Sequence, residues 1–219
     1  SILPEMIICS AFYVPKIPSC QRFGPHNYDV LCFLHGALLG DAIPNKIGGG
    51  TRIVYSHCSR QISFIRWMQK FLANKGYCTD EIPKLSKQIG KNGQIYYCAN
   101  FSTFRFSSFD WIHESFVVNG KKVVPKNIED YLSPFAIAVW IMDSGFFTGS
   151  GLQLDTKFFN PTDVEFLCQT LTHKYGWKVS INKHKNHCVL YIWKVSMPHV
   201  ISIVGPYLDE SRKFKVGQK

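Results

Sequence analysis

The hydrophobic and polar positions along the chain follow two periods, and each period predicts one kind of element. Residues 29–41 and 133–144 are apolar on nearly every side, which indicates two buried helices. Residues 51–59 alternate between apolar and polar side chains, as the two faces of a strand do. A helical apolar stripe follows over 60–73, and Gly76 just beyond it can end that helix.

The rest of the chain repeats this order after a polar linker at 118–127. Residues 44–50 and 86–93 are expected to be a loop and a turn, and the second of these ends in Asn92-Gly93, a strong hairpin signal. The other expected elements are strands at 77–85, 94–102, 151–157, 177–183 and 187–193, and helices at 106–117, 161–174 and 197–204. This repeat predicts an α+β fold with two pseudo-symmetric αββαββα halves and antiparallel sheets.

The composition indicates a partner with negative charge. The chain has 25 Lys and Arg against 15 Asp and Glu, a net charge of +10. We expect a proline-rich arm at 1–28, a first half at 29–125 and a second half at 126–219, and both halves are positive. A basic chain of this kind favours nucleic acid. No uninterrupted apolar run of about 20 residues occurs, so we expect no membrane-spanning helix and no membrane partner.

Both buried helices carry small residues and end in an acidic residue. Gly36 and Gly40 are four apart, so they share one face, and a second helix can approach that face closely. Asp41 and Asp143 come at the carboxyl ends of their helices, where the helix dipole disfavours negative charge. If the helices lie face to face, the two carboxylates meet and repel each other unless a divalent cation lies between them. A single Gly-Asp pair would otherwise be an ordinary surface cap.

These segments also resemble a known family. Leu34-His-Gly-Ala-Leu-Leu-Gly-Asp-Ala42 and Ile137-Ala-Val-Trp-Ile-Met-Asp-Ser-Gly145 resemble the paired motifs of single-chain LAGLIDADG homing endonucleases, and similar flanking segments extend the resemblance over about residues 28–216. The resemblance implies a DNA-binding saddle made by both sheets, a monomer, and metal-dependent hydrolysis of a long double-stranded DNA target. Mg²⁺ is the natural metal, because it is a hard ion with oxygen ligands.

The resemblance implies site residues, with one departure. The acidic residue is the eighth of nine in the family motif, and Asp41 holds that place in the first copy. The second copy has Ser144 there and Asp143 one place early. One residue is about 100° of helix, so we expect Asp143 not to reach the same metal without local unwinding. The site for one DNA strand is then impaired, and the protein should nick the duplex, cut it slowly or only bind it. The candidate catalytic residues are Asp41, Asp143, Ser144, Arg105 and Lys215, and the candidate metal ligands are Asp41 and Asp143.

Strand faces that mix Gln, Asn, Lys, Ser and aromatic residues suit contacts to base edges and phosphates. A solvated sheet face looks the same when only one strand is considered, but several such strands occur in this basic chain. The candidate DNA-binding residues are Asn45, Lys46, Arg52, Tyr55, His57, Lys84, Lys87, Lys91, Gln153, Asp155, Lys157, Lys178, Ser180, Asn182, Lys183, Lys185, Tyr191 and Trp193.

The cysteines do not indicate a metal knuckle. None of the eight forms a C-x-x-C pair, and several lie in apolar runs, which favours free thiols in a reducing compartment. His184, His187 and Cys188 form the only cluster with ligand-like spacing, and it reads better as a polar turn than as a zinc site.

Two classes of function stay open at this point. One is a site-specific DNA endonuclease, favoured by Asp41, Arg105 and Lys215. The other is a nucleic-acid-binding protein without cleavage, favoured by Ser144, such as an intron RNA maturase or a component of a ribonucleoprotein. In both cases we expect an organelle, a mitochondrion or chloroplast, as the location.

Overall fold

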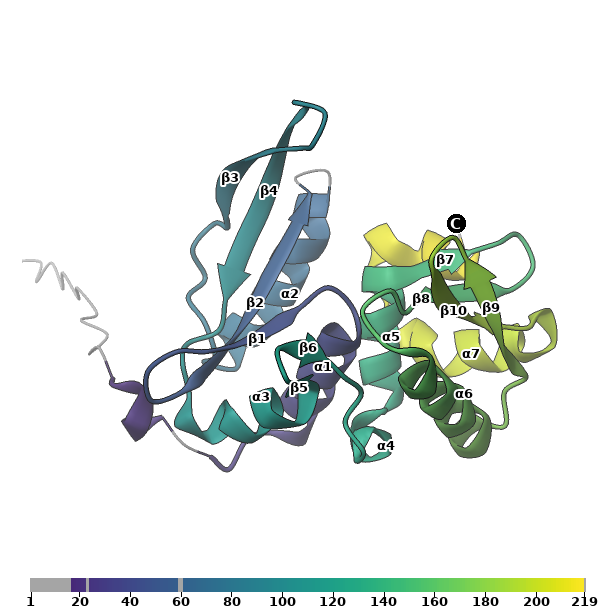
Figure 1. The fold of residues 1–219 in the computed structure, drawn as a ribbon, viewed down its shortest axis with the longest axis horizontal. Helices are drawn as coiled ribbons and strands as arrows, with labels where there is room; N and C mark the ends of the chain where they lie inside the picture. The colour runs from purple at the N-terminus through teal and green to yellow at the C-terminus, as the bar shows by residue number, and fades with distance from the viewer. Residues whose placement is uncertain (1–16, 23, 59–60, 219) are drawn as a thin grey trace, which may run out of the picture.

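The computed structural model describes residues 17–22, 24–58 and 61–218, whose strands form two four-stranded antiparallel sheets (Figure 1). Within each sheet the strands lie in the order first, second, fourth, third, as β1-β2-β4-β3 and β7-β8-β10-β9. This shared order confirms the α+β fold that the sequence repeat predicts. Residues 1–16 of the expected arm at 1–28 lie outside the described residues.

The elements alternate as expected in both halves. The first half contains α1 (Tyr28–Leu39), β1 (Ile43–Lys46), β2 (Thr51–Cys58), α2 (Ile62–Asn74), β3 (Lys84–Ile89), β4 (Ile95–Ser102) and α3 (Asp110–Phe116). A small hairpin of β5 (Val117–Val118) and β6 (Lys121–Lys122) and the short α4 (Ile128–Tyr131) follow. The second half contains α5 (Pro134–Ser144), β7 (Gly145–Phe147), β8 (Leu152–Asp155), α6 (Pro161–Tyr175), β9 (Val179–His184), β10 (His187–Ile192), α7 (Met197–Val204) and the 3₁₀ segment η6 (Glu210–Val216).

Helices α1 and α5 lie side by side at the centre, between the two sheets (Figure 1). Each begins at a residue whose side chain caps the first turn: Asn27 accepts from the backbone N–H of Asp29, and Ser133 from that of Ala136. Both helices are buried along nearly their whole length. They approach closely at Gly36, where an added Cβ would overlap the carbonyl oxygen of Ala136. The small-residue face therefore serves the close helix approach that its spacing predicts.

Each sheet is covered by helices on one face and open on the other. In β2 the buried residues alternate with partly or fully exposed ones, which is typical of a strand with one face in the core. Helix α2 contacts β2 and β4, and α6 contacts β9 and β10. The core runs through both halves and includes the fully buried Trp140 of α5.

The third strand lies later in the chain than expected. We expected a strand at 77–85 and a turn at 86–93, but β3 starts at Lys84 and pairs through Ile89 with Ile95. Tyr77 and Cys78 are buried instead in the connection after α2. The backbone N–H of Tyr77 donates to Leu72, and its carbonyl accepts from Phe104, which ties this connection to the body. The turn is therefore shorter than predicted and consists of the residues around Asn92-Gly93, between β3 and β4.

Two other expectations about local structure were wrong. The loop expected at 44–50 starts with β1, whose residues pair with β2 in register Ile43↔Val54. The linker expected at 118–127 contains the β5–β6 hairpin, because Asn119 and Gly120 both adopt positive φ, as a tight hairpin turn requires.

Among the described residues, no helix combines the length and the apolar character needed to cross a membrane. Six cysteines of the described part have free thiols: Cys32, Cys58, Cys78, Cys98, Cys168 and Cys188. Burial raises the pKa of the Cys78 thiol to about 11, so this thiol is a packing group rather than a nucleophile.

Candidate active site and nucleic-acid face

The two central helices bring their acidic ends together. Oδ2 of Asp143 accepts a hydrogen bond from the backbone N–H of Asp41 at 2.6 Å. Nε2 of His57, near the end of β2, lies 2.9 Å from Oδ1 of Asp143. One ligand atom from each of these three residues lies within 4.8 Å of the others, so in the part of the chain that the structure describes this group could hold a metal ion.

The expectation that Asp143 does not reach the same metal as Asp41 assumed that both helices end at the same depth, and the structure instead brings the two carboxylates together. Helix α1 ends at Leu39, the sixth motif position, whereas α5 continues through Ser144, the eighth. Gly40 leaves room for the incoming carboxylate, since a Cβ there would overlap Asp143. The same Cβ would lie 2.9 Å from Oγ of Ser144, so both residues stand beside the end of α1.

A cavity of about 400 Å³ opens at this point. It is lined by acidic, basic and polar side chains from both halves, among them Asp41, Asp143, Ser144, Gln153, Asp155, Lys157, His184, Lys185, His187 and Lys215. The sequence-predicted residues Asp41, Asp143, Ser144 and Lys215 are therefore brought together, and they share the cavity with residues predicted only as DNA contacts.

Each carboxylate is partnered by a side chain from the other half of the chain. His57 of the first half reaches Asp143 of the second, and both side chains are almost fully buried. Lys157 of the second half reaches Asp41 of the first, with Nζ 3.0 Å from Oδ1, and both side chains are partly exposed. Burial lowers the pKa of Lys157, but its hydrogen bond to Asp41 and the nearby carboxylates outweigh this and raise it. The sequence placed His57 and Lys157 on the DNA surface but gave no reason to connect them with the carboxylates.

The donor atoms fit a divalent cation. Oδ1 of Asp143 is buried and has no hydrogen-bond partner of proper geometry, although His57 Nε2 is close. A buried carboxylate oxygen without a donor is costly, and a cation between it, His57 and Asp41 would satisfy it. Two carboxylates and one imidazole suit ions such as Mg²⁺ or Mn²⁺.

Two half-buried lysines bind carbonyl oxygens at the helix ends. Nζ of Lys122 donates to the carbonyl oxygens of Gly40 and Ala42 at 2.6 and 2.9 Å, and Nζ of Lys215 donates to Gly145 at 2.8 Å. Burial lowers the pKa of Lys122 to about 8 against the opposing effect of Asp143 and Asp41, and burial also lowers that of Lys215. Both cations oppose the negative ends of the helix dipoles.

The structure does not bring Arg105 to the carboxylates. The neighbouring Phe106 pairs with Thr51 at the start of β2, and the carbonyl of Arg105 accepts from Arg22. His57 lies six residues further along β2, which is roughly 20 Å. The cation beside the end of α1 is instead Lys122, and the signal that could have found it is the Asn119-Gly120 turn, which predicts a hairpin that folds this lysine back.

The open face of the second sheet carries most of its predicted nucleic-acid contacts. The strand register places Gln153, Tyr191 and Ser180 side by side, and Asn182 and Asp155 flank Val189 on the same face. Trp193 extends this row: its Nε1 donates to Ser180, and Lys178 lies over its ring at 4.0 Å. Nε2 of His187 lies 2.9 Å from Oδ1 of Asp155. Lys183, by contrast, pairs with Cys188 on the opposite face, and Lys185 lies in the turn after β9.

The first sheet corrects two of its predicted contacts, Tyr55 and His57, because both lie on the buried face of β2. Tyr55 is 1% exposed and stacks on Phe101 at 4.5 Å, so it belongs to the core. Arg52 lies on the other face of β2, which is open, and its pair partner Asn45 on β1 lies on that same open face. Lys46 forms ion pairs with Asp110 and Glu114 of α3. The alternation of residues separates the two faces of this strand correctly, but it does not show which face the helices cover.

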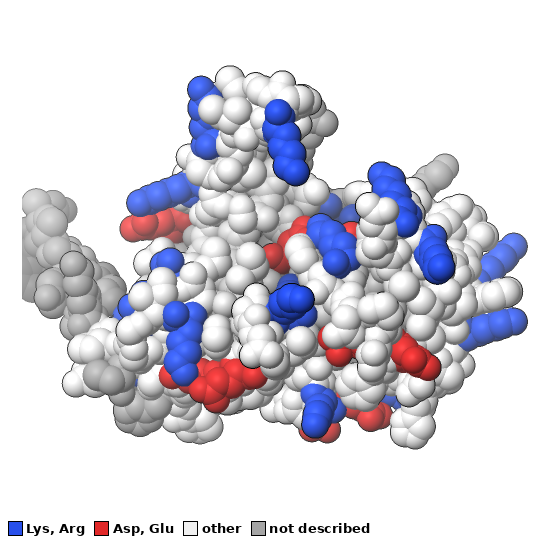
Figure 2. Space-filling view, viewed as in Figure 1, with Lys and Arg blue, Asp and Glu red and all other residues white. Residues whose placement is uncertain are grey.

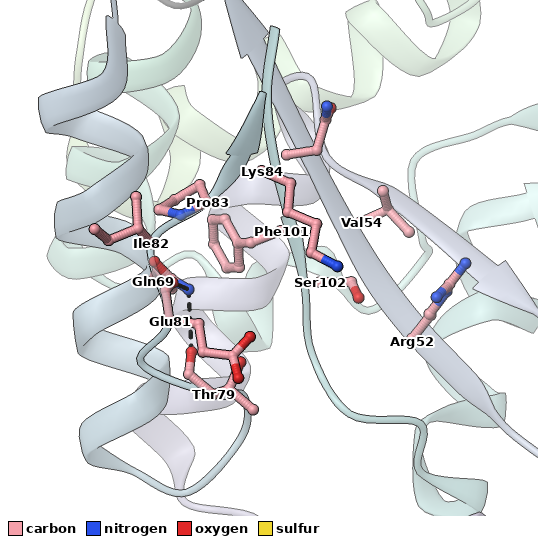
Figure 3. Close-up of a pocket in the computed structure, with 11 residues that line it drawn as sticks. Arg52, Val54, Gln69, Thr79, Glu81, Ile82, Pro83, Lys84, Phe101 and Ser102 are labelled. Carbon is pink, nitrogen blue, oxygen red and sulfur yellow. Dashed lines mark hydrogen bonds between the residues drawn. The ribbon is translucent and has the colours of Figure 1, made fainter. Parts of the chain in front are cut away.

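A second cavity, of about 430 Å³, lies at the edge of the first sheet (Figure 3). Arg52 and Lys84 line it together with Asn100 and Ser102, and a buried Gln69 fixes its wall by donating to the carbonyl oxygens of Thr79 and Glu81. Lys87 pairs with Tyr97 on the opposite face of the β3–β4 hairpin, and Lys91 lies in its turn.

Basic side chains gather over the β3–β4 hairpin and over the second sheet, with acidic side chains in the hollow between them (Figure 2). A duplex lying across both sheets would therefore meet cations at both ends and the carboxylates at its middle. The fold and the site together define the class of protein: two antiparallel sheets flank two central helices, and the acidic ends of these helices meet in one cavity.

The comparisons with known proteins give the family. The model of the LAGLIDADG DNA endonuclease family matches residues 31–200, and the chain belongs to this family. Cytochrome b mRNA maturase bI2 of Saccharomyces cerevisiae is 38% identical over 208 residues, which is 90% of this chain and 49% of that protein. The maturase bI2 of Debaryomyces hansenii is 36% identical over 197 residues, 88% of this chain and 75% of that protein. The chain thus spans about half the length of the first relative.

Two further matches are a relative named an endonuclease and a solved structure. Intron-encoded endonuclease ai4 of Dictyostelium discoideum is 37% identical over 156 residues, 68% of this chain and 98% of that protein. Among solved structures, the homing endonuclease I-WcaI bound to its DNA recognition sequence matches with a TM-score of 0.81 at 22% identity, over 90% of this chain and 89% of that one. The structural match shows the fold, and the relatives carry both maturase and endonuclease names.

Proposed function

We propose that the chain is a monomeric, site-specific DNA endonuclease that lays a long duplex across both sheets and hydrolyses phosphodiester bonds in the cavity at its centre. The observation that carries this proposal is the group of Asp41, His57 and Asp143, in which a buried carboxylate oxygen lacks a donor at the meeting point of two halves. The family and the relative named an intron-encoded endonuclease support it.

In this proposal Asp41, His57 and Asp143 hold a divalent metal ion, Mg²⁺ in the simplest case. When bound, the ion would stabilise the charge that develops on the phosphate. Lys215 and Lys157 line the same cavity and add positive charge there. Lys122 binds the carbonyls that follow α1, so it keeps Asp41 in place rather than touching DNA. Ser144 faces the cavity as a neutral hydroxyl, which supports unequal cutting of the two strands.

Phosphates would be held by Lys84, Lys91, Lys178 and Lys185, and base edges would be read by the open-face residues Arg52, Asn100, Gln153 and Asn182. An organellar location is part of the proposal, because relatives are named for introns and for cytochrome b mRNA. The free thiols fit a reducing compartment there.

The test starts with selection of a bound duplex from a random-sequence DNA library. Supercoiled plasmid carrying the selected site should be nicked or linearised in Mg²⁺, and Asp143→Asn should bind it but not cut it. Because counterions are released from the phosphates, binding should weaken steeply with added salt. A protein that selects no duplex, or cuts equally well as Asp143→Asn, would refute the proposal.

A second function is an RNA maturase without cleavage, and the two relatives named maturase bI2 favour it. It predicts tight binding to the intron RNA that encodes the chain, with no product from plasmid DNA in Mg²⁺. Parallel gel-shift titrations of this RNA and of the selected duplex distinguish the two functions.

A further inference from the structure

The two carboxylates of the cavity meet different kinds of partner. Asp143 is 3% exposed and faces the imidazole of His57. Asp41 is 34% exposed and faces the ammonium of Lys157, whose Nζ lies 3.0 Å from its Oδ1. In a chain built from two similar halves, equivalent partners would be the simplest arrangement. The difference between an imidazole and an ammonium is therefore a property of this chain.

Lys157 is held in place from several sides, unlike an ordinary surface lysine. Its Nζ also lies 3.9 Å from Oδ2 of Asp155 and 4.8 Å from the centre of the Phe158 ring. Its backbone N–H donates to Oδ1 of Asp155 at 3.1 Å. The short segment from Asp155 to Phe158 thus fixes the lysine over Asp41 from its backbone to its tip.

The two partners differ in what they can do for a metal ion. A neutral imidazole has a lone pair and is a common ligand, so His57 adds to a cation site. An ammonium has three donors and no acceptor, so Lys157 cannot be a ligand. It can only neutralise Asp41 as a cation would. Lys215 lines the same cavity and adds to the positive charge that a second ion would meet.

We propose that the cavity holds one divalent ion, among Asp41, His57 and Asp143, and that the ammonium of Lys157 takes the place of a second ion beside Asp41. This inference rests on the proposed function and deepens it. It means that the two strands of the duplex meet unlike cations at the cavity, an ion on one side and a lysine on the other. The strand beside the lysine would be cut more slowly, so a nicked product accumulates.

The experiment counts metal ions rather than activity. Mn²⁺ is titrated into the full chain bound to the selected duplex, and free Mn²⁺ is followed by its electron paramagnetic resonance signal. The unchanged chain should bind one ion. Lys157→Gln, which removes the charge and offers a carbonyl oxygen, should bind two, whereas Lys157→Arg should stay at one. Lys70→Gln, on the exposed side of α2, is the matched control and should also bind one.

The outcomes separate this inference from the function. Two ions in the unchanged chain, or one ion in Lys157→Gln, would overturn the role of Lys157 while leaving metal-dependent cleavage intact. No bound ion in any variant, together with no plasmid cleavage, would remove the proposed function itself, and this inference with it. Circular dichroism of each variant confirms that the count comes from folded protein.

Discussion

The close approach of α1 and α5 allows one substitution to be tested at two sites with opposite results. A Cβ on Gly36 would lie 2.9 Å from the carbonyl carbon of Ala136 and would overlap its oxygen, and these are backbone atoms. A Cβ on Gly40, one turn later, would overlap the carboxylate of Asp143, which is a side chain that can rotate away. Gly36→Ala should therefore lower the stability of the fold, and Gly40→Ala should disturb the site.

The magnitude for Gly36→Ala follows from the geometry. Ordinary carbon contacts begin near 3.4 Å, so clearing the carbonyl carbon at 2.9 Å already requires α1 to withdraw by 0.5 Å, and clearing the nearer oxygen requires more. A gap of about 0.5–1 Å loses roughly a quarter to a half of the dispersion attraction, and overpacking costs about 1–3 kcal/mol. We expect the upper end, because a backbone oxygen cannot rotate. Replacing Gly by Ala inside a helix stabilises by about 1 kcal/mol, which leaves a net loss of about 2 kcal/mol.

The assay is urea unfolding of both variants followed by circular dichroism, with a thermal scan beside it. For a chain of this length a loss of about 2 kcal/mol lowers the melting temperature by roughly 4–8 °C. Gly40→Ala should melt much closer to the unchanged chain but should lose plasmid cleavage. Ala136→Gly should not rescue Gly36→Ala, because the obstacle is the backbone oxygen. Unchanged stability in Gly36→Ala, or rescue by Ala136→Gly, would refute the close backbone contact.

Three further predictions concern polar groups at or near the two central helices. Asp41→Asn and Asp143→Asn should reduce plasmid cleavage to a similar extent while DNA binding persists, because both belong to one ligand group; cleavage by Asp143→Asn at the unchanged rate would contradict this. Lys122→Met should lower the free energy of unfolding, measured in urea, by about 1–3 kcal/mol, because it leaves the carbonyls of Gly40 and Ala42 without their donor. The control is Lys70→Met, which changes an exposed lysine in the same way. Burial lowers the pKa of His35 from 6.5 to about 4, so the unfolded chain binds a proton first as pH falls. Stability from this residue is therefore intact above pH 6.5 and falls between pH 6.5 and 4, by about 3 kcal/mol in all. His35→Leu should show a correspondingly shallower loss of stability on acidification, and equal acid sensitivity in both proteins would rule out His35 as the source.

The sequence predicted the elements whose residues all share one role. The two central helices are apolar on every side, so their position and burial follow from composition alone. The antiparallel strands of the second sheet follow from alternation, and their open faces carry the polar residues expected there. The expected strand at 77–85 failed because Tyr77 and Cys78 are apolar for a different reason: they fill the space beside α2 rather than one face of a strand.

The site was harder to predict, because its geometry depends on where chain segments meet. The linker looked like a polar connection, yet its Asn119-Gly120 turn carries Lys122 to the end of α1, a contact between residues 82 apart in the chain. Arg105 has the right charge and stands after a strand, but at the far end of β2 from His57. Charge and local sequence do not distinguish these two positions. What differs is the length of β2, which separates Arg105 from His57, and the direction of the β5–β6 hairpin, which brings Lys122 to the end of α1.

The two copies of the motif show why a sequence repeat predicts the shared fold of two halves better than it predicts the chemistry of each half. Gly40 and Asp143 hold the same motif position, seventh of nine, in the two copies. One has no side chain, and the other places its carboxylate in the space that the first leaves empty. A carboxylate at both positions would put two negative charges into the same volume, and a glycine at both would leave the backbone N–H of Asp41 without its acceptor. The difference between the copies is therefore complementary, and it explains why α5 can continue through Ser144 while α1 ends at Leu39. In a single chain each copy can specialise in this way, because its partner always has the other residue.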